Sequence, residues 1–432
     1  MQPGKFILEL SSRLVVLGVL AVAGATLASS QTDNVLYRFK GSTDNGIPRA
    51  GLVADKSGNL YGTTSGFQIG CGTVFELIKP VSVGSPWTED VIYTFNCESE
   101  ATPYDGVIMD SAGNLYGTTF DNSNGSVFEL SPPAAPGDPW TEAELHSFTG
   151  TNGDGAGSVA SLIMDSAGNL YGTTENGGTR TGQCASSDGC GVVFELSPPA
   201  SSGGAWTETI VRAFDGPDGQ VPAAGVVFDG KSLFGTTFYG GTNGVGVIFR
   251  LLPPAVQGPP WNETVLYNFT SVDDGGYPAA NLVVHNGNLY GTAAGGPEFI
   301  ADSNGTCQCG ALFELSPPSA PGGAWTESTL HLFTGGSDGG APYAGVVFDP
   351  SGNLYLTTDT GGTSNEGTVA EFTPPSEAGG AWTETILANF EGGNDGSYPA
   401  GGLIFGPSNE LYSTTSFGGA KCNCGTVFRV KP

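Results

Sequence analysis

Acidic side chains beside glycine recur along the sequence at points where the chain has to turn. Five such turns also contain a proline, and their carboxylates are Asp44, Asp218, Asp274, Asp338 and Asp395. Aromatic residues stand beside these prolines or in a second set of loops, namely Tyr104, Tyr277, Tyr343, Tyr398, Phe238 and Tyr239. Carboxylates that hydrogen-bond hydroxyl groups, with aromatic faces that stack on sugar rings, suit a carbohydrate-binding surface. The alternative is structural: the Asp residues form turns and the aromatic residues fill gaps between loops.

Residues that could catalyse a reaction or hold a metal ion are few. None of the three His residues has a metal-ligand spacing or stands beside a plausible nucleophile. A glycoside hydrolase needs only two carboxylates, and the candidates are Asp121, Glu175, Glu298 and Asp359. Nothing in the sequence distinguishes a pair of these from solvated acids, so we assign no catalytic residue and no metal ligand. Calcium on the Asp-Gly turns is an open alternative, although no loop has the alternating ligand spacing of a calcium motif; we expect no other cofactor.

The elements that position these residues form a repeat. GNLYGTT occupies Gly58 to Thr64, recurs unchanged at Gly113 to Thr119 and at Gly168 to Thr174, and returns in four altered copies. Successive copies are 55 to 65 residues apart, a period that suits a four-stranded propeller blade. Each copy is accompanied by three further strand-like runs, typified by GLVAD, GTVFEL and VLYRF. Seven sets of four such runs predict an all-β fold, a seven-bladed β-propeller with four-stranded antiparallel blades.

The two ends of the repeat predict how the ring closes. The sequence opens on a lone VLYRF run, Val35 to Phe39, and closes on GTVFRV, Gly425 to Val430, with no such run after it. Pairing the first run with the last blade would complete that blade and leave no open sheet end.

The repeated pattern of GLVFD, SGNLYGTT, GTVFELSPP, WTET and a terminal LYxF resembles the GloVer tandem repeat of secreted bacterial proteins, whose members carry a choice of C-terminal anchors. The resemblance covers nearly all of residues 33–430. It implies a β-propeller without implying a reaction. Because the sequence ends at Lys431-Pro432 without a sorting segment, we expect simple secretion rather than anchoring.

Most of the repeated residues suit structural roles. In DSAGNLYGTT the polar residues fit a turn with Asx-type capping and a glycine at positive φ, whereas a phosphate loop would require a following helix. All six Trp residues open the outer strand, where we expect them to pack between blades, with sugar stacking as the alternative.

Eight cysteines permit four disulfides in an oxidising compartment. The candidate pairs are Cys71–Cys97, Cys184–Cys190, Cys307–Cys309 and Cys422–Cys424. The last two pairs enclose one residue each, so cross-loop pairing or thiolate metal binding is the alternative.

Residues 1–28 predict a secretory signal peptide, because Lys5 and Arg13 precede an apolar run from Leu14 to about Ala25 that small residues follow. The alternative is an uncleaved membrane anchor. Residues 29–432 would then form one propeller with no membrane span, and we expect a secreted monomer, extracellular or at the cell surface. The net charge of −28 argues against nucleic acid and anionic membranes as partners.

Together these features favour a noncatalytic binding protein that recognises a glycan or a surface protein through the acidic and aromatic loops of one face. The alternatives are an extracellular carbohydrate-active hydrolase or lyase that uses loop carboxylates, and a purely structural surface protein.

Overall fold

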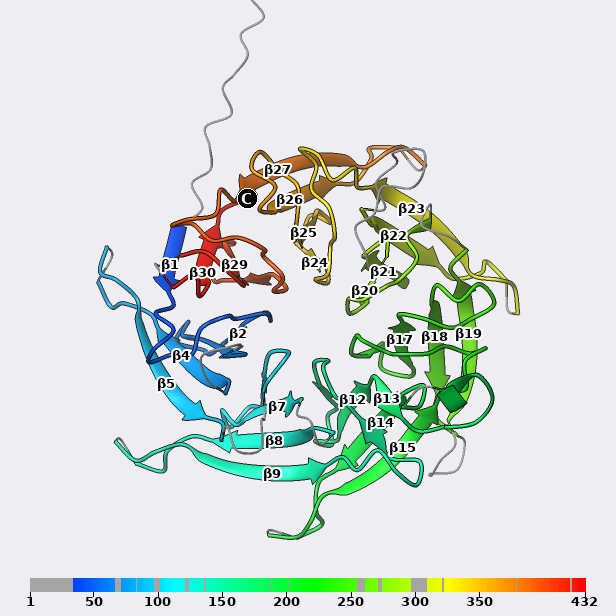
Figure 1. Ribbon diagram of the computed structural model, residues 1–432. Helices are drawn as coiled ribbons and strands as arrows, with labels where there is room; N and C mark the ends of the chain where they lie inside the picture. The colour runs from blue at the N-terminus through cyan, green and yellow to red at the C-terminus, as the bar shows by residue number, and fades with distance from the viewer. Residues whose placement is uncertain are drawn as a thin grey trace, which may run out of the picture. The chain divides into compact units, whose positions relative to one another are not determined.

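Seven four-stranded antiparallel sheets follow one another around a central axis (Figure 1), as the sequence predicts. The structure is a computed structural model that describes residues 34–66, 71–82, 84–96, 102–120, 124–135, 137–186, 188–201, 203–254, 261–270, 274–296, 309–320, 322–377, 379–419 and 422–432. The predicted signal peptide lies outside these residues. No helix within them is both long and apolar enough to cross a membrane.

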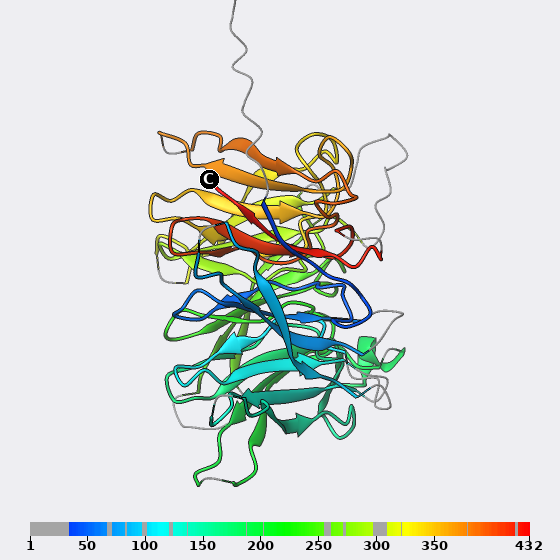
Figure 2. The same ribbon diagram turned by 90° about the vertical axis from the view of Figure 1, so that its left-hand side faces the viewer.

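Each sheet is one blade, and blades 1 to 7 follow the order of the chain. From the inner to the outer strand they are β2 (Val53–Ala54), β3 (Leu60–Thr64), β4 (Thr73–Ile78) and β5 (Thr88–Thr94); β6 (Ile108–Met109), β7 (Leu115–Thr119), β8 (Ser126–Ser131) and β9 (Thr141–Ser147); β11 (Ile163–Met164), β12 (Leu170–Thr174), β14 (Val192–Ser197) and β15 (Thr207–Ala213); β16 (Val227–Phe228), β17 (Leu233–Thr237), β18 (Val247–Leu252) and β19 (Asn262–Asn268); β20 (Val283–His285), β21 (Asn288–Ala293), β22 (Ala311–Ser316) and β23 (Thr326–Leu332); β24 (Val347–Phe348), β25 (Leu354–Thr358), β26 (Thr368–Thr373) and β27 (Thr383–Asn389); β28 (Ile404–Phe405), β29 (Leu411–Thr415), β30 (Thr426–Val430) and β1 (Asn34–Arg38). Loops of blade 3 add a two-stranded sheet, β10 (Gly155–Ala156) with β13 (Asn176–Gly177), and a short 3-10 helix, η2 (Gly182–Ser186). Figure 2 shows the sheets from the side, with loops at both ends of the strands.

The ring closes by the predicted pairing of the first strand with the last blade. β1 runs antiparallel to β30, with Val35 opposite Phe428 and Tyr37 opposite Val427. β30 is therefore covered on its outer side, and the blade order β1-β30-β29-β28 mixes both ends of the chain. Closure gives the last blade the same four strands as the others, with β1 in place of β30 as its outer strand.

The GNLYGTT segment begins with a capped turn, as its sequence predicts. In blade 2 the carboxylate of Asp110 accepts hydrogen bonds from the backbone N–H groups of Ala112 and Asn114, at 2.8 and 2.9 Å. Gly113 completes the turn at φ 92°, in the left-handed region where glycine carries no steric penalty. The role of this segment in the fold is structural.

The Gly within LYGTT makes room for the Phe of the neighbouring strand. A Cβ built on Gly117 would lie 2.6 Å from the ring of Phe128, and four other blades show the same conflict. In blade 6 Leu356 replaces this Gly, and its cross-strand partner Ala370 replaces the Phe. Both residues are fully buried, so the blade keeps its core filled by exchanging the large residue for the small one.

Adjacent blades are joined by two contacts that the repeat reproduces around the ring. In every blade except blade 4, the first Thr of GTT donates its hydroxyl to a backbone carbonyl of the next blade; Thr63 reaches Asp105 at 2.9 Å, and Thr414 closes the ring on Ala50 at 2.8 Å. Each Trp packs edge-on against the aromatic residue of GNLYGTT in the preceding blade, for example Trp140 against Tyr61 with ring centroids 6.2 Å apart. The predicted packing role of the Trp residues is confirmed at all six interfaces.

Candidate functional site

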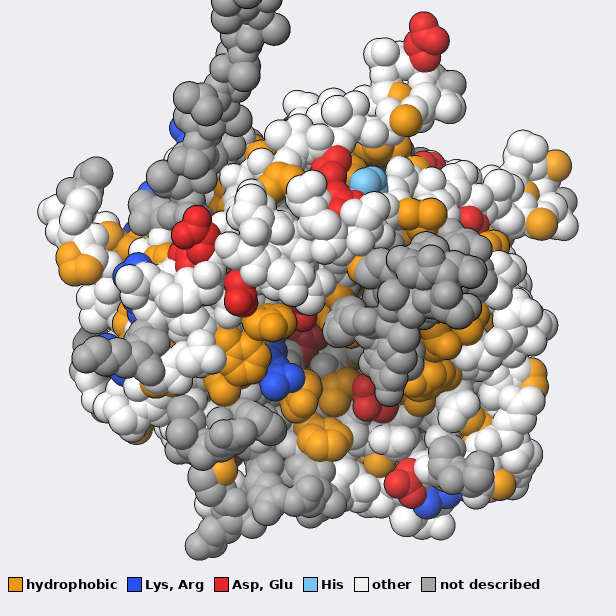
Figure 3. All heavy atoms as spheres, turned by 45° about the horizontal axis from the view of Figure 1, so that its top comes forward, with side chains coloured by type: hydrophobic (Ala, Val, Ile, Leu, Met, Phe, Trp, Pro, Cys, Tyr) orange, Lys and Arg blue, Asp and Glu red, His pale blue; other side chains and the backbone are white. Residues whose placement is uncertain are grey.

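A cavity of about 890 Å³ opens on one face of the ring, at its centre. Its wall combines two loop sets: the segments that lead into the inner strands and the residues that follow GTT in the second strands. Figure 3 shows a hollow in this face where hydrophobic, acidic and basic side chains meet. Both loop sets emerge on the same face, as the propeller topology predicts.

Backbone hydrogen bonds between blades fix the residue that follows GTT. Ala341, buried and at φ 53°, donates its N–H to the carbonyl of Cys309 in blade 5 and accepts the N–H of Asp359 in blade 6, at 2.7 and 3.1 Å. Tyr398, at φ 56°, bridges Glu366 and Ser416 in the same way. A left-handed conformation is uncommon for residues other than glycine and persists where the surrounding structure imposes it. These hydrogen bonds therefore fix the residue after GTT relative to the loop that precedes its blade.

Three carboxyl side chains line the cavity: Asp105, Glu175 and Asp359. Glu175 and Asp359 each follow GTT in their blades, and burial raises the pKa of both side chains. The pKa of Asp359 rises to about 7, against a smaller opposing effect of the Arg49 charge. Its Oδ1 is buried without a hydrogen-bond partner. Asp359 is therefore a carboxyl group that can exchange a proton near neutral pH.

Asp105 begins a polar chain that crosses four blades at the cavity. Burial raises its pKa, while hydrogen bonds from the N–H of Gly106 and from the N–H and hydroxyl of Ser161 oppose this rise. Ser161 in turn accepts a hydrogen bond from Asn281 at 2.5 Å, and Asn281 also accepts the N–H of Gly225 at 2.6 Å. A Cβ at Gly225 would lie 2.5 Å from the Ser161 carbonyl, so glycine is required for this close approach. The chain gives one side of the cavity a fixed set of donors and acceptors.

Aromatic rings and one guanidinium surround these polar groups. The cavity is lined by seven aromatic side chains, Tyr104, Phe120, Phe238, Tyr239, Tyr343, Tyr398 and Phe417. The guanidinium of Arg49 lies over the ring of Tyr104, 5.2 Å from its centroid. Tyr104 and Tyr398 are 39 % and 38 % exposed, so part of each ring is accessible to a ligand. The cavity thus offers apolar faces around a few convergent polar groups, the usual composition of a small-molecule site.

Of the predicted site residues, five aromatic residues line the cavity: Tyr104, Phe238, Tyr239, Tyr343 and Tyr398. Tyr277 packs behind Phe238 and Tyr239, with ring centroids 5.3 and 5.8 Å away. Among the predicted catalytic candidates, Glu175 and Asp359 line the cavity, whereas Asp121 and Glu298 lie outside the described residues.

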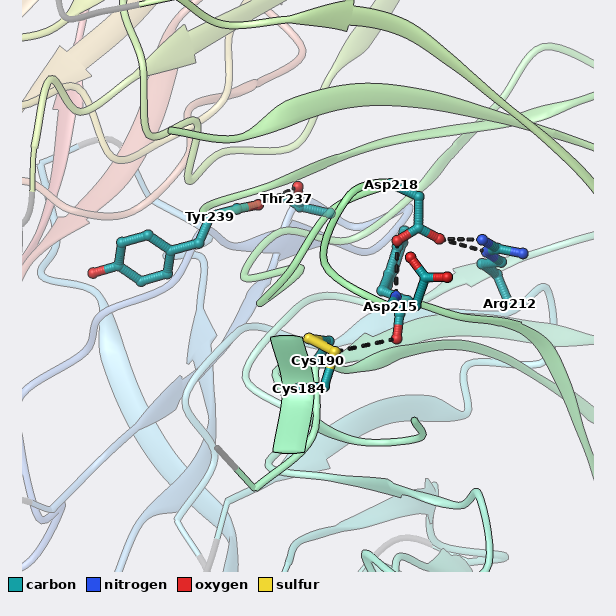
Figure 4. Close-up of a disulfide and its surroundings, with 8 residues drawn as sticks. Cys184, Cys190, Arg212, Asp215, Asp218, Thr237 and Tyr239 are labelled. Carbon is teal, nitrogen blue, oxygen red and sulfur yellow. Dashed lines mark hydrogen bonds and ion pairs between the residues drawn. A yellow bond between two sulfur atoms is a disulfide. The ribbon is translucent and has the colours of Figure 1, made fainter. Parts of the chain in front are cut away.

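The five predicted Asp residues of the acidic turns do not line the cavity. Their carboxylates accept hydrogen bonds from their own loops and lie near the outer strands; Asp44, for example, accepts the N–H groups of Lys40 and Gly41 and the hydroxyl of Tyr37. Figure 4 shows Asp218 bonded to Arg212 and Asp215, with the ring of Tyr239 pointing away from them. Although burial opposes it, the N–H of Asp215 and the Arg212 guanidinium lower the pKa of Asp218. The other three turns, at Asp274, Asp338 and Asp395, also accept backbone N–H groups of their own loops.

Disulfides tie the loops of the cavity face. Cys184 is bonded to Cys190 (Figure 4), and Cys422 is bonded to Cys424. Cys71 and Cys309 are also disulfide-bonded, while their predicted partners Cys97 and Cys307 lie outside the described residues. The carbonyls of Cys190, Cys309 and Cys424 each accept an N–H from a loop that borders the cavity.

Two charged cavity residues, Asp105 and Arg49, were missed by the sequence analysis, and the sequence contains a signal for one of them. Asp105 stands where the other blades have Ala50, Ala160, Ala224, Ala280, Ala344 and Gly401. An acid at a position otherwise reserved for small residues marks a departure from the repeat. Arg49 follows the proline of its turn, and nothing in its sequence context distinguishes it from a solvated arginine.

One group among the described residues has the geometry to hold a metal ion: His146, Asp154 and Glu208, away from the cavity.

Comparison with known proteins places the repeat in a family. The model of the Gloeobacter/Verrucomicrobia repeat matches residues 22–183, 70–298 and 299–432. The chain belongs to this repeat family. The resemblance seen in the sequence is confirmed, and no curated protein matches the chain.

Several solved structures align with this member of the repeat family, at TM-scores below 0.5. They include a putative oxidoreductase (glucose dehydrogenase) from Thermus thermophilus, with 13 % identity, a TM-score of 0.43, and 92 % of this chain and 99 % of that chain covered. The NanB sialidase of Streptococcus pneumoniae has 10 % identity and a TM-score of 0.42, with 92 % of this chain and 70 % of that chain covered. Extracellular domains 1–2 of Drosophila semaphorin 1a have 10 % identity and a TM-score of 0.44, with 93 % of this chain and 88 % of that chain covered. At these identities the likeness does not extend to function.

Proposed function

We propose that the protein acts outside the cytoplasm as a noncatalytic binding protein whose central cavity binds a carbohydrate. The observation that carries this proposal is the meeting of seven aromatic side chains, three carboxyls and one guanidinium in a cavity of about 890 Å³. Sites for small ligands have volumes of roughly 300–1,000 Å³ and combine apolar walls with a few placed polar groups.

A hydroxyl-rich ligand matches the chemistry of the wall. The partly exposed rings of Tyr104 and Tyr398 offer faces on which a pyranose ring can stack. Asp105, Glu175 and Asp359 offer carboxyl oxygens that pair with hydroxyl groups. The net charge of −28 disfavours nucleic acid, whose binding requires clustered basic side chains. Disulfides at the cavity loops support a location outside the reducing cytoplasm.

A glycan array followed by calorimetric titration tests the proposal. We expect at least one oligosaccharide to bind, and Tyr398→Ala to lower its affinity about tenfold by removing a stacking face. Phe228→Ala is the matched control, because Phe228 is an exposed aromatic residue of β16 that does not line the cavity. Absence of glycan binding, or equal effects of the two substitutions, would contradict a carbohydrate site in this cavity.

Glycoside hydrolysis is the second candidate, and Asp359 is the observation that favours it. A carboxyl whose pKa lies near 7 and whose Oδ1 has no partner is suited to donate a proton to a leaving group. The expected outcome is release of reducing ends from a bound oligosaccharide, with activity falling above pH 7 and lost in Asp359→Asn. A ligand that binds and is recovered intact would exclude this candidate and leave the binding function in place.

A further inference from the structure

Five of the blade interfaces are spanned near the perimeter by a repeated contact whose middle residue varies. Its outer residues are two carboxylates, an Asp of the acidic turn and a Glu from the outer strand of the next blade. At the interface of β1 with blade 1, the hydroxyl of Tyr37 lies 3.0 Å from Asp44 and 3.2 Å from Glu89. The hydroxyl of Tyr37 thus contacts both carboxylates.

At the interface of blades 3 and 4 a cation occupies the same place. The guanidinium of Arg212 forms ion pairs with Asp218 and with Glu263, the latter at 2.6 Å (Figure 4 shows the Asp218 pair). The carboxylate pair at this position is therefore built to accommodate positive charge between its two members. Two buried carboxylates that face each other are costly unless a cation compensates them.

At the interface of blades 2 and 3 the middle residue is His146, and its distances to the two carboxylates are longer than those of Tyr37. Its Nε2 lies 3.7 Å from Oδ1 of Asp154 and 3.6 Å from Oε1 of Glu208, too far for hydrogen bonds. All three atoms are buried, have no hydrogen-bond partner and lie within 4.8 Å of one another. The other oxygen of Asp154 accepts the N–H and hydroxyl of Thr149, which fixes the direction of Oδ1.

These separations suit ligands around a metal ion. With zinc–ligand distances of about 2.0–2.2 Å, two ligand atoms of a tetrahedral site lie roughly 3.3–3.6 Å apart. Imidazole nitrogen and carboxylate oxygen are both ligands that zinc accepts, and a water molecule can complete the four-coordinate set. We propose that His146, Asp154 and Glu208 bind a divalent transition-metal ion of the zinc class, which clamps blade 2 to blade 3 as the guanidinium clamps blades 3 and 4.

A related triad supplies an internal comparison at the interface of blades 5 and 6. The Nε2 of His331 lies 3.4 Å from Asp338 and 4.0 Å from Glu384. Here both oxygens of Asp338 already accept hydrogen bonds from Thr334, at 2.8 and 2.5 Å. This triad lacks the carboxylate oxygen that Asp154 leaves open, so it should bind the ion more weakly.

Zinc titration of the tag-free, disulfide-bonded chain after chelation tests the assignment. We expect one equivalent of Zn²⁺ to bind with heat and to raise the melting temperature. His146→Arg copies the arrangement around Arg212, so it should fold, keep the melting temperature of the zinc-free protein and lower zinc affinity at least 100-fold. His331→Arg is the matched control and should leave tight zinc binding intact.

Several outcomes would overturn the proposal. If adding zinc releases or absorbs no heat and does not shift the melting temperature, the triad holds a proton rather than a metal ion. A response to Ca²⁺ alone would place any ion site elsewhere. Loss of binding in His331→Arg but not in His146→Arg would assign the ion to the other triad. If His146→Arg does not fold, Glu208→Gln replaces it, and unchanged zinc affinity in that variant would equally refute the site.

Discussion

Asp359 should make the stability of the propeller depend on pH with a sign opposite to that of an ordinary paired aspartate. Its folded-state pKa of about 7 exceeds the ordinary value of 3.8, because the side chain is buried against the cavity wall. Between these two values the folded chain holds a proton that the unfolded chain has released. The contribution of Asp359 to the free energy of unfolding is therefore highest below about pH 4, falls as pH rises, and levels off above about pH 7.

Asp359→Asn removes this dependence while keeping the size of the side chain. As pH rises from below 4 to above 7, the difference between the two pKa values lowers the free energy of unfolding of the wild type by about 4 kcal/mol. About 2.5 kcal/mol of this change occurs between pH 5 and pH 8. For a chain of this length, that change amounts to a shift in melting temperature of about 3 °C. The variant should melt slightly above the wild type at pH 5. At pH 8 the difference between their melting temperatures should be about 3 °C larger than at pH 5.

Thermal melts of both proteins across this pH range, with urea unfolding at the two ends, measure the effect. Other buried carboxyls, such as Glu263, shift the stability of both proteins alike and cancel in the difference. Asp138→Asn removes the same charge from an exposed loop position and should melt in parallel with the wild type. If the melting curves of Asp359→Asn and the wild type stay parallel from pH 5 to pH 8, the raised pKa of Asp359 is refuted.

Two further outcomes test the core and the cavity. Leu356→Gly should leave a void in blade 6 and Ala370→Phe should overfill it, and each should lower the free energy of unfolding in urea by about 2–3 kcal/mol. The double variant should recover most of that loss. Additive losses would contradict the exchange of large and small residues. Asp105→Ala restores the residue type of the other blades, so it should melt within about 2 °C of the wild type yet bind the oligosaccharide about tenfold more weakly in calorimetry; unchanged affinity would remove Asp105 from the site.

The fold could be predicted because each blade repeats the contacts that define it. The glycine that faces Phe128, the Thr that reaches the next blade and the Trp that covers Tyr61 recur in the same order in most blades, so a single interpretation of the repeat applies around the ring. The lone first strand followed from the same count, and β1 pairs with β30 as expected. A departure in one blade, such as Leu356 for Gly, is compensated within that blade.

The candidate site was predicted less completely than the fold, because two kinds of acidic residue look alike in a sequence. The Asp of an acidic turn and the Asp of a ligand site both stand beside glycine in a loop. In the structure the turn carboxylates fold back onto N–H groups of their own loops, as Asp338 does onto Thr334. The cavity carboxylates instead stand near strand ends: Glu175 and Asp359 directly follow the second strand of their blades, and Asp105 lies three positions before the inner strand β6.

The His146 triad could not be found from spacing because its members belong to two blades. His146 and Asp154 are eight positions apart, but Glu208 comes from the outer strand of the following blade. Sequence motifs for metal ions rely on ligands of one turn or one helix. Ligands that meet only when two blades pack require the register of the repeat and the structure of the interface.

The position after GTT explains how a regular ring can carry an irregular site. Its backbone N–H is held by the loop of the preceding interface in all seven blades. The side chain varies around the ring, which carries Ser65, Phe120, Glu175, Phe238, Ala294, Asp359 and Ser416 at this position. All of these residues except Ser65 and Ala294 line the cavity. At this position acids and aromatic residues occupy different blades, so the cavity has no rotational symmetry. Under the proposed function, the order of these side chains around the ring would set which ligand the cavity prefers, on a scaffold that stays the same.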